Sequence, residues 1–431
     1  MSVPHIVIVG GGYVGMYTAL RLRRAVHAGE ARVTVVEPRS AMTYQPFLPE
    51  AAAGSLEPRH VVVPLRRTLR ATDVVTARLV SVQAADRTVT VQPPDGASYD
   101  IGYDHLVVAL GSIARTLPIP GLAEQGMGFK QIEEAIALRD KVLECLDVAA
   151  SVRDAATRSS ALTFVFVGGG YAGVEALAEI EDMTRFATRY YDNLSADDLR
   201  FVLVEASNRI LPEVGADMGR YTVDRLRERR IDVRLETRLE SCVDGHVVLS
   251  DGAEFDAGTI VWTAGVKANP VLEQTDLPLD DKGRLKTRTD LRVEGFDEVW
   301  AAGDNAAVPD LTRPGQFCSP SAQHAVRQAR MLGDNLVRSL HGEPLHDYRH
   351  KYVGSVASLG LYQGVAQVYG IKLRGFPAWF MHRTYHMTRM PTFNKKVRVV
   401  LDWTLALCFR RDVVSMGSPQ RARDDFERAN Q

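Results

Sequence analysis

The chain has few cysteines, almost no net charge and no long apolar run. Its four cysteines are scattered over 431 residues, without a CxxC pair or a zinc-like spacing to histidine. A disulfide framework or a bound metal is therefore not expected. The net charge of −1 gives no electrostatic case for nucleic acid as a partner. No apolar run could cross a bilayer, and a strand beginning by His5 leaves no room for a signal peptide, so a cytoplasmic protein is expected.

Size and composition are those of an ordinary soluble protein. Apolar residues make up 45% of the chain and charged residues 24%. A length of 431 residues exceeds what one hydrophobic core usually supports, so two or three domains are expected.

A glycine loop near the start of the chain has the GxGxxG pattern. Gly10, Gly12 and Gly15 follow the apolar run of residues 6–9 and precede a helical pattern. Glycines in this context let backbone N–H groups approach a pyrophosphate at a helix N-terminus. A second apolar run ends in Glu37, placed to accept hydrogen bonds from an adenosine ribose. The alternative is a tight turn with no ligand.

The same phrase returns about 160 residues later as "FVFVGGGYAGVEALAE". Gly168, Gly170 and Gly173 repeat the pattern, and the strand that follows ends in Glu205. A carboxylate there hydrogen-bonds a ribose 2′-OH and repels a 2′-phosphate, which favours NADH over NADPH. Arg209 lies nearby and could soften that preference.

Two such loops in one chain predict two nucleotides that must meet. A tightly held FAD and a visiting NADH, aligned for hydride transfer, are the usual pair. The alternative is a duplication in which one site no longer binds.

Two further phrases resemble flavoproteins of the glutathione reductase type. These are "YDHLVVALGS" at 103–112, which contains Gly111, and "VWAAGDNA" at 299–306, in which Asp304 would contact the ribityl chain of FAD. The resemblance implies an α/β fold of two Rossmann-like dinucleotide-binding domains, with a C-terminal membrane-associating segment. It places FAD on the first loop and NADH on the second. The expected domains are 1–118 with 286–345 for FAD, 119–285 for NADH, and a C-terminal domain at 346–431.

Disulfide reductases of this type carry a CxxxxC soon after the first acid, but residues 37–60 contain no cysteine. That stretch, with 259–270, 321–329 and 353–370, resembles the type II NADH:quinone oxidoreductases. The family implies a single-subunit enzyme with non-covalent FAD that reduces a membrane quinone without pumping protons. It also implies peripheral binding at the cytoplasmic face of the cell membrane. A homodimer is an open alternative.

The resemblance also implies site residues. Glu175, after the second loop, corresponds to a glutamate implicated in quinone protonation, and Gln323 belongs to the family's AQxAxQ motif beside flavin and quinone. The implied cofactor-binding residues are Gly10, Gly11, Gly12, Tyr13, Val14, Gly15, Glu37, Pro38, Leu79, Gly111, Asp304, Ala322, Gln323, Gly168, Gly170, Gly173, Glu205 and Gly265.

Each candidate has a plainer interpretation. Glu175 would be an acid in the first helical turn, favoured by the macrodipole. Gln323 and His324 would be polar residues of a helix capped by Ser321. The last position of AQxAxQ is Arg327, a permanent cation that cannot accept a hydrogen bond. The motif therefore does not by itself define which electron acceptor the protein uses.

Cysteine chemistry of the kind found in sulfide:quinone oxidoreductases is a further alternative for the flavin site. Neither Cys145 nor Cys318 lies in a context that resembles those enzymes. Buried, incidental thiols are the expected explanation for both.

The C-terminal stretch is basic and aromatic. Residues 371–411 hold nine Lys or Arg against one acid, Asp402, together with Trp379 and Trp403. Such a segment suits the surface of an anionic membrane. The alternatives are a solvated basic face or a dimer contact. A soluble flavin reductase that passes electrons to a small protein or oxygen, and an NADH-binding redox sensor, remain alternative functions.

Overall fold

The computed structural model describes residues 3–350, 354–409, 411–415 and 417, and it divides into two units. The first comprises Met1–Thr43, Val63–Ile113 and Val266–Tyr352, and the second Tyr44–Val62, Ala114–Gly265 and Val353–Gln431. This division groups 266–285 with the first unit and the C-terminal segment with the second, unlike the boundaries expected from the sequence. The assignment of FAD and NADH to these units stays a prediction.

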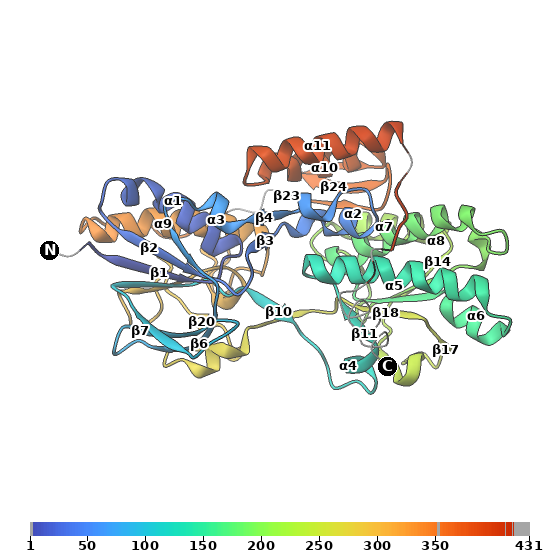
Figure 1. Ribbon diagram of the computed structural model, residues 1–431, viewed down its shortest axis with the longest axis horizontal. Coiled ribbons are helices and arrows are strands. Elements are labelled where there is room, and N and C mark those ends of the chain that lie inside the picture. The colour runs from blue at the N-terminus through green and yellow to red at the C-terminus, as the bar shows by residue number, and fades with distance from the viewer. Residues whose placement is uncertain (1–2, 351–353, 410, 416, 418–431) are drawn as a thin grey trace, which may run out of the picture. The chain divides into compact units, whose positions relative to one another are not determined.

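A parallel five-stranded sheet forms the centre of the first unit (Figure 1). Its order is β21 (Val299–Ala301), β9 (His105–Val108), β1 (His5–Val9), β2 (Arg32–Val36) and β5 (Asp73–Val75). The strands are β-branched and apolar, and β1 is buried along its whole length, as expected for a sheet covered on both faces. Because β21 pairs with β9, residues near 300 share a sheet with the first glycine loop.

Two helices of the first unit, α1 (Tyr13–His27) and α9 (Ala322–Leu340), pack together (Figure 1). The Thr18 hydroxyl donates to the Ala329 carbonyl at 3.2 Å, and Gly333 leaves room for the side chain of Arg21. The other elements of this part of the chain are β3 (Ala41–Thr43), β4 (Val62–Pro64), α3 (Leu65–Thr68), β6 (Arg78–Gln83), β7 (Thr88–Gln92), β8 (Tyr99–Gly102), β10 (Ser112–Ala114), β19 (Val266–Ala268), β20 (Leu285–Lys286) and β22 (Ala306–Ala307).

The second unit repeats the parallel design. Its sheet has the order β11 (Gly126–Gly128), β18 (Thr259–Trp262), β12 (Thr163–Val167), β13 (Arg200–Val204) and β14 (Ile231–Arg234). Phe164 and Phe201 stack at 4.9 Å between ring centroids in its core. The expectation of two Rossmann-like parallel sheets is therefore confirmed. Membrane association of the C-terminal segment stays a prediction.

Helix α7 (Tyr171–Ala187), which follows β12, is enclosed by several elements of the second unit. It contacts α2 (Leu48–Ala52), α5 (Ile132–Ser151) and β23 (Gly354–Ser358). The unit also contains α4 (Leu122–Gln125), α6 (Ala155–Ala161), α8 (Ala216–Glu228), β15 (Leu239–Ser241), β16 (His246–Leu249), β17 (Glu254–Asp256), β24 (Gly364–Val368), β25 (Ile371–Arg374), α10 (Phe376–Arg389) and α11 (Phe393–Cys408). No helix in the described part of the chain is both long and apolar enough to span a membrane.

Candidate functional site

The first glycine loop joins β1 to α1 and needs its glycines for close backbone approach. Gly10 has φ +106, and a Cβ there would lie 2.3 Å from the Ala109 carbonyl oxygen. A Cβ on Gly15 would lie 1.7 Å from the Gly10 carbonyl oxygen. At Gly12 nothing of the protein lies within 4 Å, so this position faces open space. The loop is thus a cradle that a pyrophosphate group fits.

The second loop, between β12 and α7, has the same geometry. Gly168 has φ +116, and a Cβ there would lie 2.7 Å from Thr263 Oγ1. A Cβ on Gly173 would lie 1.9 Å from the Gly168 carbonyl oxygen, while Gly170 again faces open space. The structure therefore shows two matching cradles, neither of them degraded.

The two predicted acids also hold matching positions. Glu37 Oε2 accepts a hydrogen bond from the Gly11 N–H at 2.6 Å, and Glu205 Oε2 accepts one from the Gly169 N–H at 2.6 Å. The other oxygen of each acid accepts from a backbone N–H two residues on, in the second case that of Ser207 at 2.7 Å. Each carboxylate thus lies at the edge of its cradle, where a ribose would bind.

The first cradle is completed by residues distant in sequence. Asp304 accepts a hydrogen bond from the Ser112 hydroxyl at 2.7 Å, and the Asn305 amide oxygen accepts from the Gly111 N–H at 3.1 Å. Gln328 of α9 accepts from the Gly303 N–H at 2.7 Å. The contacts of Ser112, Asn305 and Gln328 were not predicted, although these residues lie in the stretches 103–112, 299–306 and 321–329, because a local motif does not show which of its side chains pair across the fold.

The remaining predicted cofactor residues fall on loops or strand ends. Tyr13 and Val14 begin α1, Pro38 follows β2, and Leu79 is buried at an irregularity of β6. Gly265, with φ +92, follows β18 in the second unit.

Helix α9 begins with Ser321 as its N-cap, followed by Ala322 and Gln323, the AQ pair of the family motif. The Ser321 hydroxyl accepts from the His324 N–H at 3.2 Å, which confirms the predicted cap. Arg327 donates to the Gln323 carbonyl oxygen at 3.1 Å and lies 3.4 Å from Gln323 Oε1. The arginine that departs from the family motif therefore lies along Gln323, and Ala322 beside it is exposed.

Glu175 is buried in the second unit, with only 7% of its surface exposed. Its Oε1 accepts a hydrogen bond from the Ser358 N–H at 2.9 Å and lies 3.1 Å from His382 Nε2. Because α7 begins at Tyr171, Glu175 lies beyond the first turn, so the interpretation as a first-turn dipole acid is wrong. Burial lowers the pKa of His382, but the nearby acids Glu175, Glu50 and Glu179 together raise it above its ordinary value.

Further charged groups are buried around the same helix. Glu50 lies 2.9 Å from Arg383 and accepts a hydrogen bond from Trp403 Nε1 at 2.8 Å. Glu179 is fully buried one turn beyond Glu175. Of these residues only Trp403, in the basic stretch, was singled out by its sequence pattern, although the four-residue spacing of Glu175 and Glu179 already indicated two acids on one helix face.

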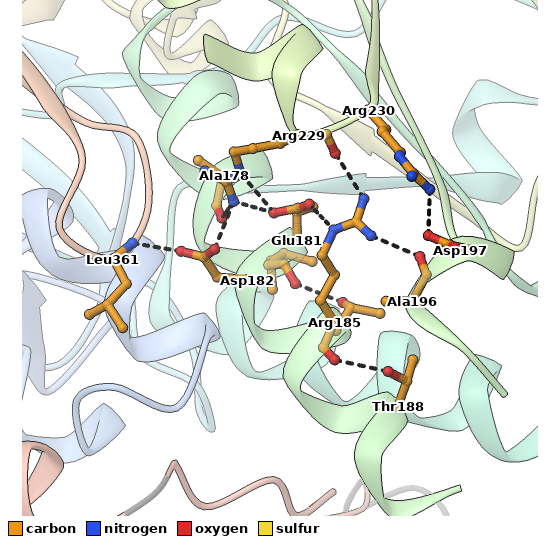
Figure 2. Close-up of polar contacts among 12 residues, drawn as sticks. Ala178, Glu181, Asp182, Arg185, Thr188, Ala196, Asp197, Arg229, Arg230 and Leu361 are labelled. Atoms are coloured by element: carbon orange, nitrogen blue, oxygen red, sulfur yellow. Dashed lines mark hydrogen bonds and ion pairs between the residues drawn. The ribbon is translucent and has the colours of Figure 1, made fainter. Parts of the chain in front are cut away.

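A second group of charges ties the far end of α7 to its surroundings (Figure 2). Arg229 pairs with Glu181 and lies 2.9 Å from Asp182, and it also donates to the Ala178 carbonyl. Asp182 in turn accepts from the Leu361 N–H at 2.6 Å. This network anchors the turn after β23 to α7.

A family model described as pyridine nucleotide-disulphide oxidoreductase matches residues 4–329. The chain belongs to this family. Among curated relatives, a "Probable NADH dehydrogenase" of Dictyostelium discoideum is 28% identical over 95% of this chain and 91% of its own length. A "Type II NADH:quinone oxidoreductase" of Staphylococcus aureus is 29% identical over 88% of this chain and 93% of its own. The predicted resemblance to type II NADH:quinone oxidoreductases is thus confirmed.

A solved structure supports the same fold. NDH2 from Plasmodium falciparum in complex with NADH matches with a TM-score of 0.89 at 18% identity, covering 96% of this chain and 100% of that one. At that identity the likeness concerns the fold. In this member of the pyridine nucleotide-disulphide oxidoreductase family, the two residues predicted to act on the acceptor, Gln323 and Glu175, belong to different units.

Proposed function

We propose that this protein is a type II NADH:quinone oxidoreductase, which oxidises NADH and reduces a membrane quinone. The observation that carries the proposal is the pair of intact, matching cradles at Gly10–Gly15 and Gly168–Gly173. An enzyme that must hold two dinucleotides needs both cradles, whereas a duplicated remnant does not. The curated relatives with NADH dehydrogenase and NADH:quinone oxidoreductase names agree with it.

We assign non-covalent FAD to the first cradle and NADH to the second. Asp304 and the Gly111 turn share a unit with the first cradle, as an FAD site of this family requires. When bound, FAD supplies the two-electron relay between NADH and quinone. Glu205, held by the Gly169 N–H, presents a carboxylate that disfavours a 2′-phosphate.

We assign the acceptor end of the reaction to Gln323 and Glu175. Reduction of a quinone by NADH consumes one proton from solvent, since the hydride brings two electrons and one hydrogen. The Glu175 carboxyl group, oriented by the Ser358 N–H and lying 3.1 Å from His382 Nε2, is the group that we assign to pass this proton to a quinone oxygen. The neighbouring His382 stabilises the carboxylate that remains. Arg327 fixes the side chain of Gln323.

We assign peripheral attachment at the cytoplasmic face of the membrane to α11. Its outward residues Phe393, Leu401 and Leu405 are 80%, 54% and 56% exposed, and only Val399 of this helix is buried. Lys395, Lys396 and Arg398 lie on the same helix, and such cations favour anionic lipid. Co-sedimentation with anionic liposomes at low salt tests this assignment. If the protein stays in the supernatant as a dimer, the apolar face is a homodimer contact.

The activity itself is tested by separating its two half-reactions. Anaerobic mixing with NADH is expected to bleach the flavin absorbance, and a short-chain quinone is expected to restore it. Reoxidation by quinone no faster than by oxygen would eliminate the quinone assignment and favour a soluble flavin reductase. Failure of NADH to bleach the flavin would overturn the assignment of the second cradle.

A further inference from the structure

Strand β23 lies at the edge of its sheet and contacts helix α7. In the described part of the chain β23 pairs only with β24, in a three-stranded sheet of order β23, β24 and β25. Successive N–H groups of a strand point to alternate sides, so every second N–H of an edge strand needs a partner outside the sheet. The N–H of Ser358, the last residue of β23, has this partner in Glu175 Oε1 at 2.9 Å. The hydrogen bond to Glu175 therefore depends on how β23 is held against α7.

Three acids on one face of α7 bond the end of β23 and the turn that follows it. Glu175, Glu179 and Asp182 are four and three residues apart, a spacing that places them on a single helix face. The Ser358 N–H donates to Glu175, and the Ser358 hydroxyl donates to Glu179 Oε1 at 3.3 Å. Asp182 Oδ2 accepts from the Leu361 N–H at 2.6 Å (Figure 2). The segment is thus bonded to α7 at both of its ends, by Glu175 at one end and by Asp182 at the other.

Arg229, which follows α8, holds Asp182 and the turn together. Its guanidinium lies 2.9 Å from Asp182 Oδ1 and donates to the Leu359 carbonyl oxygen. Gly360 lies against both groups with φ +90, and a Cβ there would be 2.3 Å from Asp182 Oδ2 and 2.9 Å from Arg229 Nη1. The turn can therefore approach Asp182 this closely only because residue 360 has no side chain.

Apolar packing also holds β23 against α7 but does not place a single N–H. Ala357 and Leu359 are buried in the same apolar core as Leu177 of α7. Such packing has no directional preference, whereas a hydrogen bond weakens steeply when its angle departs from linear. The position of the Ser358 N–H relative to α7 is therefore set by the directional bonds on either side of it.

We propose that Asp182 is a positioning residue for Glu175, an inference that rests on the proposed function. By holding the turn at 359–361 on α7, Asp182 keeps the Ser358 N–H on the Glu175 carboxyl group and so keeps this acid oriented toward the quinone. Asp182 itself neither gives nor takes a proton in this role. His382 Nε2 lies 3.1 Å from the same Glu175 oxygen. Loss of the Ser358 N–H would leave His382 as the single polar partner of Glu175 among the described residues.

Asp182→Ala tests the proposal because it removes the acceptor of the turn and leaves Glu175 and Ser358 in place. In stopped-flow measurements on the flavin-loaded protein, flavin reduction by NADH is expected to be unchanged. Reoxidation by a short-chain quinone is expected to slow about tenfold, because proton transfer depends steeply on the placement of the acid. Hydrogen exchange measured by mass spectrometry is expected to be faster in residues 354–361, since the turn is no longer anchored.

Glu181→Gln is the matched control for a loss of charge on α7. Glu181 is 1% exposed and pairs with Arg185 and with the same Arg229, but it bonds no described residue of 358–361. Both half-reactions and the exchange of 354–361 are expected to match the wild type. Equal slowing of reoxidation in Glu181→Gln and Asp182→Ala would show a general structural loss and would overturn the proposal.

A double-mutant cycle tests whether Asp182 acts through Glu175. In a Glu175→Gln background, adding Asp182→Ala is expected to slow reoxidation by less than about twofold, because residues that act through one another are not additive. A second, independent slowing of about tenfold in that background would show that Asp182 acts elsewhere. A general loss of folding would also appear as an additive effect.

Gly360→Ala gives a second variant that changes no charge and applies even if Asp182→Ala does not fold. Its Cβ would push the turn away from Asp182, so slower reoxidation and faster exchange of 354–361 are expected. Gly370→Ala is its control, because Gly370 has φ +82 between β24 and β25 but faces open space. Gly370→Ala is expected to match the wild type in both measurements.

The outcomes separate a failure of the positioning role from a failure of the proposed function. If quinone reoxidises the wild type, and Asp182→Ala and Gly360→Ala both keep the wild-type reoxidation rate, the positioning role is wrong while the quinone function stands. If quinone does not reoxidise wild-type flavin, the proposed function itself has failed. The exchange of 354–361 still decides in that case whether Asp182 holds the segment that carries the Ser358 N–H.

Discussion

The two nucleotide cradles have the same backbone but are followed by chemically different helices. Counted from the tyrosine that begins each helix, Glu175 of α7 corresponds to Tyr17 of α1, and Glu179 corresponds to Arg21. Tyr17 lies under the guanidinium of Arg330, and Arg21 forms an exposed ion pair with Asp334. The acids of α7 are instead buried against β23, α10 and the C-terminal segment.

The two copies share the glycine loop proposed to bind a dinucleotide and differ in the helix that follows it. The glycine loop and its acid show the same steric and hydrogen-bonding pattern in both copies, as expected if each holds a dinucleotide as we propose. The helix beyond the loop is free to differ. In α1 it packs against α9, and in α7 it carries Glu175, the acid that we assign to proton transfer.

The largest difference between the two helices is expected when their corresponding residues, Glu175 of α7 and Tyr17 of α1, are substituted. Glu175→Gln keeps the shape of the side chain but cannot donate a carboxylic proton. Reoxidation of flavin by quinone is expected to slow about 100-fold, as general acid catalysis typically contributes this much. Reduction by NADH should stay near the wild-type rate, as measured by stopped-flow absorbance.

Tyr17→Phe is the control for that experiment. It changes the equivalent position of α1 and is expected to leave both half-reactions intact. Equal losses in both half-reactions of Glu175→Gln would return Glu175 to a purely structural role.

The cradles themselves can be compared with one matched pair of variants. A Cβ at Gly12 or Gly170 meets nothing in the protein, so Gly12→Ala and Gly170→Ala should fold normally. Gly12→Ala is expected to be purified with much less flavin. Gly170→Ala should keep its flavin and show a KM for NADH raised about tenfold, corresponding to roughly 1.5 kcal/mol of lost contact with the pyrophosphate.

Flavin content by absorbance and KM by steady-state assay decide the outcome. If Gly170→Ala lost flavin while Gly12→Ala kept it, the assignment of the two cofactors would be reversed.

The smallest expected effect concerns stability against pH. Burial raises the pKa of Glu179 to about 7 from an ordinary 4.5, so between these values the folded protein binds more protons than the unfolded chain. Its contribution to the free energy of unfolding therefore falls as pH rises through this window. Glu179→Gln removes that loss, so its Tm relative to wild type should rise by a few degrees between pH 5 and pH 8.

Arg21→Gln tests the equivalent position in α1. Exposed ion pairs contribute little, so its Tm difference from wild type should be small and should not change with pH over the same range. Scanning calorimetry of both variants supplies the measurement. A Tm difference for Glu179→Gln that is flat with pH would contradict the raised pKa.

Much of the fold and part of the site could be predicted from the chain alone. The glycine loops, the strands before them and the acids Glu37 and Glu205 follow from short local patterns, and the structure places them as expected. Sequence could not reveal Ser358 or His382 as partners of Glu175, because these residues are about 180 and 200 positions away and belong to no motif. The first-turn interpretation of Glu175 failed because the helix begins at Tyr171, before the last glycine of the loop.

The sequence by itself determined the two glycine cradles with the strand before each and the acid after it, because short-range sterics and apolar patterning specify these features locally. Tertiary structure decided which polar side chains are removed from water together. Glu179, Ser358 and Arg411 are far apart in the sequence, and only folding brings the Glu179 carboxyl within 4 Å of both the Ser358 hydroxyl and the Arg411 guanidinium. Burial sets the proton affinity of a carboxylate, and burial is a property of the whole fold.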